Sequence, residues 1–68
     1  MNKKALEEKY LGRTIVIVSI SGEPYYYSHY SNRSGKVELV DDMGQLHGTW
    51  GGLALQPEND KFVVIGGR

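Results

Sequence analysis

Residues 40–52 read VDDMGQLHGTWGG, and this stretch decides how the chain folds. Asp41 and Asp42 favour the start of a turn, because aspartate side chains accept hydrogen bonds from nearby backbone N–H groups. Gly44 can adopt the left-handed conformation that ends such a turn. Residues 45–50 then return in the opposite direction. The stretch therefore predicts a β-hairpin.

The return strand alternates between an apolar face and a polar face. Leu46, Gly48 and Trp50 share the face that we expect to lie against the core. Glycine is unfavourable inside a strand, so Gly48 indicates a bend or a close approach between two backbone segments. Gly51 and Gly52 predict a second tight turn directly after the tryptophan.

Apolar and β-branched runs predict strands on both sides of the first turn. They cover residues 13–20, 36–40, 53–55 and 61–65. The intervening residues 56–60 predict a compact turn. Val37 and Leu39 alternate with polar residues, so we expect both to face the core. Residues 2–10 predict a short helix with Asn2 as its N-terminal cap.

These elements predict an all-β fold. About five short strands with turn signals between them are typical of a small antiparallel barrel. Along the chain, a long loop is followed by two hairpins, a compact turn and a final strand, which is the order of an SH3-like barrel. We therefore expect a single domain with a short N-terminal helix in residues 1–11 and an SH3-like barrel in residues 12–66.

Size and charge exclude several classes of protein. The chain has 68 residues and no cysteine, so neither a disulfide nor a zinc thiolate can stabilise it. Its eight basic and eight acidic residues cancel. This balance argues against a protein that binds nucleic acid mainly through phosphate contacts, and it offers no attraction to an anionic membrane. Without a long apolar run or a secretory signal, we expect a cytoplasmic protein.

The C-terminal half resembles a known family. Its pattern is found in GKVELVDDMGQLHGTWGGLALQPENDKF, residues 35–62. The matching positions are Gly35, Val37, Val40, Asp41, Asp42, Gly44, Leu46, His47, Trp50, Leu53, Leu55, Pro57, Asp60 and Phe62. In these residues, and more weakly in the strand LGRTIVIVSI, the chain is similar to short bacterial domains of unknown function from phages and mobile elements of Gram-positive bacteria.

The resemblance implies an SH3-like fold and no known activity. One position departs from the family pattern. After the tryptophan, the family usually has an acidic residue or asparagine before its glycine, whereas this chain has Gly51 followed by Gly52. Any polar contact made by that residue in the family would therefore be lost here.

Neither catalysis nor metal binding has a convincing signature in the chain. A catalytic triad needs a nucleophile held by a base, but Ser28 and His29 are neighbours that would point to opposite faces of a strand. The hairpin turn explains the carboxylates of Asp41 and Asp42. We therefore expect a protein that is not an enzyme and that uses no cofactor and no metal ion.

Two residues of the hairpin have open interpretations. His47 lies on the face opposite the core and could hydrogen-bond a neighbouring strand or a turn carboxylate such as Asp42, or it could contact a partner. Trp50 is expected to be the largest part of the core. If one face of its ring is exposed, it would instead form a docking surface.

The tyrosine-rich stretch between residues 21 and 35 is the main functional indication. Its side chains offer flat rings and hydroxyl groups at low entropic cost, as in peptide-binding grooves and base-stacking surfaces. The alternative is that these rings close the end of the barrel or form a contact between two copies. The candidate partner-binding residues are Tyr25, Tyr26, Tyr27, Tyr30, His47 and Trp50.

From the sequence we expect a non-enzymatic binding module that recognises a protein or peptide through this loop. One alternative is a nucleic-acid-binding accessory protein of a mobile element, in which Arg13, Arg33 and Lys36 would contact phosphates. The other is a small structural protein that acts as a homo-oligomer. Strong salt dependence would favour nucleic acid over a peptide.

Overall fold

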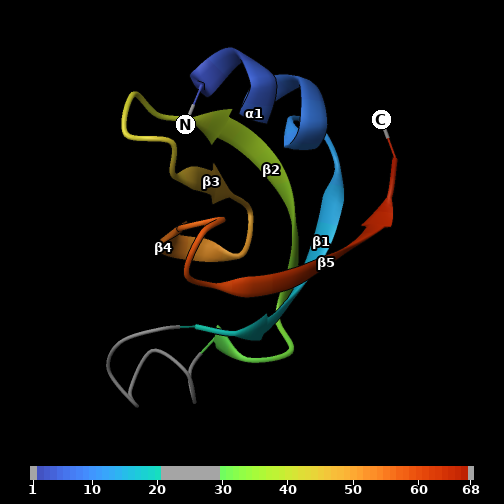
Figure 1. Ribbon diagram of the computed structural model, residues 1–68. Helices are drawn as coiled ribbons and strands as arrows, with labels where there is room; N and C mark the ends of the chain where they lie inside the picture. Colours follow the sequence, from blue (N-terminus) through green and yellow to red (C-terminus); the bar gives the residue numbers. More distant parts are fainter. Residues whose placement is uncertain (1, 21–29, 68) are drawn as a thin grey trace.

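The computed structural model describes residues 2–20 and 30–67, which form one short helix and five strands (Figure 1). The elements are α1 (Lys3–Tyr10), β1 (Thr14–Ser19), β2 (Ser34–Val40), β3 (Leu46–Gly48), β4 (Gly51–Leu55) and β5 (Lys61–Gly66). All strand pairs are antiparallel. The predicted five-stranded antiparallel architecture with an N-terminal helix is therefore confirmed for these residues.

The sheet is open in this structure. Its strand order is β4-β3-β2-β1-β5, so β4 and β5 form the two edges. Within the described residues, these two edge strands are not paired with each other. The expected closure of the strands into a barrel is therefore not confirmed.

The helix is held at its start by a cap and along its length by docking. The side chain of Asn2 accepts a hydrogen bond from the backbone N–H of Lys4 at 2.9 Å. Leu6 is the buried residue of α1, which packs against β2 (Figure 1). After the helix, Gly12 has a φ of 82°. A helix of this length is unstable alone, so these contacts account for its presence.

The core is built around a tryptophan that fits between two glycines. The buried hydrophobic residues are Leu6, Ile15, Ile17, Ile20, Val37, Val40, Leu46, Trp50 and Leu55. A side chain at Gly35 or Gly48 would overlap Trp50. The indole N–H of Trp50 donates to the carbonyl oxygen of Leu53 at 2.7 Å. A β-carbon at Gly48 would also overlap the backbone oxygen of Lys36, so the close backbone approach predicted for Gly48 is confirmed.

A bulge in β2 changes which residues face the core. Val37 pairs with Gly48, whereas Leu39 pairs with His47, so β2 contains one residue more than β3 between these pairs. Val37 and Val40 are buried, but Leu39 is 53% exposed. The prediction that Leu39 faces inward is wrong, because the extra residue shifts the alternation of side chains by one position.

The second turn lies earlier than predicted. Gly48 pairs with Gly51, so the turn consists of Thr49 and Trp50, and both following glycines belong to β4. Strand β2 holds this turn: Thr49 N donates to Lys36 O at 3.1 Å, and Lys36 N donates to Thr49 Oγ1 at 2.9 Å. These contacts, together with burial of the indole, locate the turn more strongly than the Gly-Gly pair does.

Candidate binding site

The tyrosine-rich stretch lies largely outside the described residues. Three of the candidate binding residues fall there: Tyr25, Tyr26 and Tyr27. Tyr30 is described, and its half-buried ring packs against the core. The guanidinium carbon of Arg33 lies 5.0 Å from the centroid of this ring, and Arg33 Nη1 donates to Trp50 O at 2.8 Å. Arg33 thus attaches Tyr30 to the turn between β3 and β4.

Trp50 belongs to the core. Trp50 as a whole is 1% exposed, so its interpretation as a core residue is confirmed, and its ring offers no open face in this structure. Its contribution to the surface comes from its backbone, because its carbonyl oxygen accepts the hydrogen bond from Arg33. Of the two described candidates, Tyr30 and Trp50, Tyr30 is therefore the one whose ring is partly accessible to a partner.

Asp41 organises the turn between β2 and β3. Its Oδ1 accepts hydrogen bonds from the backbone N–H groups of Met43 and Gln45, each at 2.9 Å. Its Oδ2 lies 2.8 Å from Nε2 of His47. The hydrogen bond from His47, followed by that from Gln45 N–H, lowers the pKa of Asp41 below its ordinary value. The carboxylate therefore joins the turn to strand β3.

His47 therefore binds a turn carboxylate, which is one of the two roles predicted for it. The carboxylate is that of Asp41 and not that of Asp42, which the sequence had suggested. His47 binds Asp41, whereas Asp42 Oδ1 forms an ion pair with Lys3 Nζ at 2.9 Å. This pair, with its hydrogen bond, raises the pKa of Lys3. Asp42 is nearly fully exposed, so this ion pair contributes little to stability.

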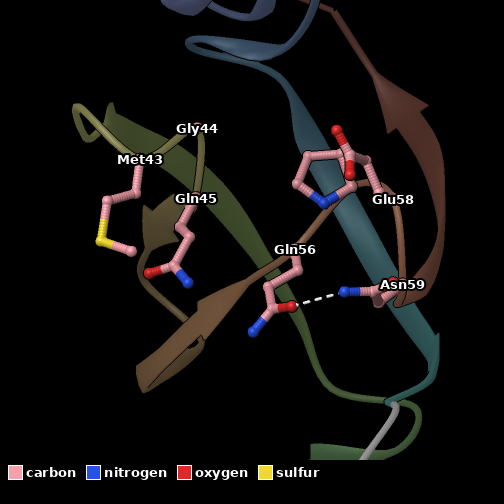
Figure 2. Close-up of a pocket in the computed structure, with 7 residues that line it drawn as sticks. Met43, Gly44, Gln45, Gln56, Glu58 and Asn59 are labelled. Carbon is pink, nitrogen blue, oxygen red and sulfur yellow. Dashed lines mark hydrogen bonds between the residues drawn. The ribbon is translucent and has the colours of Figure 1, made fainter. Parts of the chain in front are cut away.

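A pocket opens between this turn and the turn that connects β4 with β5 (Figure 2). Its volume is about 250 Å³, and it is open to solvent. One wall comes from the first turn and the other from the second, and Figure 2 shows side chains of both facing the hollow. The lining residues are Met43, Gly44, Gln45, Gln56, Pro57, Glu58 and Asn59.

A second aspartate holds the other wall. Asp60 is 7% exposed, and its Oδ2 accepts a hydrogen bond from Gln56 N at 2.8 Å. The backbone N–H groups of Asn59 and Asp60 both donate to the carbonyl oxygen of Gln56. The side chains of Asn59 and Gln56 are also joined, by a bond of 2.7 Å from Nδ2 to Oε1 (Figure 2). Both walls are therefore fixed by carboxylates that are part of the fold.

Sequence reasoning identified both turns but missed the pocket between them. Leu46 pairs with Leu55, so the residues just outside this pair, Gln45 and Gln56, lie beside each other. A turn at Gly51 and the glycine after it would have given a different register. Correct placement of the turn would not have been enough, because a register shift between the Gly48–Gly51 pair and the Leu46–Leu55 pair adds two residues on β4, and this irregularity brings the two walls together.

The described residues contain no group of His, Cys, Asp or Glu side chains that could hold a metal ion. In the same part of the chain, no helix has the length and apolar character needed to cross a membrane. In comparisons with known proteins, no family model matches the chain, and neither does any curated protein sequence or solved structure.

Proposed function

We propose that this protein is a non-enzymatic binding module that recognises a segment of a partner protein or peptide. The observation that carries the proposal is the preformed pocket between the β2–β3 and β4–β5 turns, lined by Met43, Gln45, Gln56, Pro57, Glu58 and Asn59. At about 250 Å³, it is smaller than the roughly 300–1,000 Å³ of most small-molecule sites. That volume suits one or two amino-acid side chains.

The chemistry of the lining also supports a polypeptide ligand. Gln45, Gln56 and Asn59 carry carboxamides, which both donate and accept hydrogen bonds, as backbone amides of a ligand require. Met43 is 82% exposed, and its flexible thioether can adapt to apolar groups of different shape.

We include the tyrosine-rich segment in the proposed surface. Ser19, near the point where this segment leaves the sheet, pairs with Lys61, which directly follows the wall formed by the β4–β5 turn. Tyr25, Tyr26 and Tyr27 would then provide a second contact for a ligand that extends from the pocket. Tyr30 would form the end of that contact, held by Arg33.

The strand order supports a finer proposal about the fold. A four-strand meander with the fifth strand beside the first gives the order β4-β3-β2-β1-β5, as in SH3-like barrels. We propose that the domain is an SH3-like barrel with one open side and that its relatives are the bacterial domains named above. A binding module of a phage or mobile element acting in the cytoplasm would agree with this proposal.

Selection from a random-peptide library displayed on phage tests the function. We expect binders whose addition shifts the backbone and carboxamide NMR signals of Gln45, Gln56 and Asn59. The matched variants are Met43→Ala, in the pocket, and Leu39→Ala, which changes an exposed residue outside it. Met43→Ala should weaken binding and Leu39→Ala should not. Failure to select any binder, or shifts confined to other surfaces, would overturn the proposal.

A second candidate function is favoured by a different observation. Val18 of β1 and Val63 and Ile65 of β5 are exposed apolar residues on neighbouring strands, and β5 is an edge strand. A structural protein acting as a homo-oligomer would cover such a surface. Sedimentation equilibrium distinguishes the candidates: a mass of 7.6 kDa that is independent of concentration would exclude the oligomer.

A further inference from the structure

We propose that the pocket receives the basic side chain, arginine or lysine, of the partner polypeptide. This inference rests on the proposed function, because it names the ligand group that the same pocket recognises. It combines three properties of the pocket: a carboxylate without an internal partner, an apolar path leading to it, and hydrogen-bond acceptors beside it. Each comes from a different part of the lining.

The carboxylate is that of Glu58, the charged residue of the lining. Within the described residues it is exposed and takes part in no hydrogen bond or ion pair. The neighbouring acidic side chains of the β2–β3 turn differ, because Asp41 binds His47 and Asp42 binds Lys3. Glu58 is therefore the negative charge at this pocket that a ligand can pair with.

Apolar groups of the lining fit the stem of a long basic side chain. Met43 comes from one wall and Pro57 from the other, so methylene groups placed between them would contact both. Lysine and arginine bury their stems on such surfaces while the charged group stays near water. A pocket that is open to solvent allows this arrangement.

Acceptors beside the carboxylate complete the match. Asn59 uses Nδ2 to bond Gln56, which leaves Asn59 Oδ1 available as an acceptor. Gln45 carries a second carboxamide on the opposite wall (Figure 2), and rotation about its last side-chain bond would turn the oxygen toward a ligand. Arginine and lysine carry only donors, so they suit a set of acceptors around a negative charge. Glu58 would repel an acidic ligand group. An apolar ligand group would bury the carboxylate of Glu58 without giving it a hydrogen-bond or ionic partner.

The test uses peptides selected from the phage library. We expect selected sequences to share an arginine or lysine. Replacing that residue by citrulline, which keeps the shape of arginine without its charge, should weaken binding about fivefold, as expected for an exposed ion pair. Glu58→Gln should remove this difference between the arginine and citrulline peptides. Glu38→Gln, which changes an exposed carboxylate of β2 outside the pocket, should leave the difference intact.

The outcomes separate this inference from the function on which it rests. If pocket-binding peptides are selected but bind equally well with citrulline, the pocket recognises peptides and the inference is wrong. The same conclusion follows if Glu58→Gln leaves the preference for arginine unchanged. If no peptide binds the pocket, the proposed function and the inference fail together.

Discussion

Gly48 illustrates how strongly one position depends on its neighbours. A β-carbon there would overlap both Lys36 O and the ring of Trp50. We expect Gly48→Ala to lower the free energy of unfolding by about 2 kcal/mol, because the core must shift to admit the methyl group. Urea unfolding measures this change. Gly52→Ala is the control, since nothing lies within 4 Å of a β-carbon at that position. Equal stability of the two variants would contradict the prediction.

Asp41 predicts how the protein responds to acid. Its pKa in the folded protein lies below the ordinary value, because His47 and two backbone N–H groups donate to the carboxylate. Because the pKa is lowered, the ionised carboxylate contributes its full stabilisation at pH values above the pKa of an unfolded aspartate. This contribution is lost as the pH falls through the lower pKa of the folded protein. Stability should therefore decline between about pH 5 and pH 2.

Thermal unfolding at a series of pH values tests this account of Asp41. Asp41→Asn should lower Tm at neutral pH and should reduce the further loss of Tm in acid. Asp42→Asn is the matched control, because Asp42 is nearly fully exposed and should leave the acid profile close to that of the unmodified protein. Parallel acid profiles for Asp41→Asn and the unmodified protein would show that other carboxylates dominate.

The bulge in β2 makes a prediction about a whole strand. It puts Leu39 on the surface, whereas Leu6 of α1 is 4% exposed. We expect Leu6→Ala to cost about 3 kcal/mol of stability through the cavity that it leaves. The same change at Leu39 should cost about 0.5 kcal/mol or less. Chemical denaturation compares the two, and a large loss for Leu39→Ala would mean that β2 has the regular register predicted from its sequence.

Local patterns predicted most elements of the fold. The capped helix after Asn2, the strand centred on Ile15 and Ile17, and the turn that ends at Gly44 were all recognisable, because each depends on residues close in sequence. The inward position of Leu39 and the turn at Gly51 were predicted wrongly. Both errors arise where a neighbouring strand, through a bulge or through hydrogen bonds to Lys36, determines the register.

At the scale of the whole molecule, the sequence could not reveal the pocket. Its walls, residues 43–45 and 56–59, come from separate turns that are brought together by the pairing of Leu46 with Leu55. Closure of the sheet is equally non-local, because it depends on how much all five strands bend. The prediction of Tyr25, Tyr26 and Tyr27 as binding residues lies outside the described residues and stays a prediction.

The charge of the molecule predicts its response to nucleic acid. The formal net charge is zero, and the guanidinium of Arg33 is engaged by Tyr30 and Trp50 O. We therefore expect no binding of single-stranded DNA at about 150 mM salt, where non-specific binding rests on phosphate contacts. Fluorescence anisotropy of a labelled oligonucleotide measures this. Tight binding that weakens steeply with salt would instead favour the nucleic-acid alternative.

The burial of Trp50 has a practical consequence. It is the sole tryptophan of the chain, and its indole lies in the core with its N–H bonded to Leu53 O. Its fluorescence therefore originates from one defined, apolar location that dissolved quenchers cannot reach while the domain is folded. Unfolding would shift the emission to longer wavelength and admit the quencher. The protein thus carries its own optical reporter, and the stability of every variant above can be read without attaching a dye.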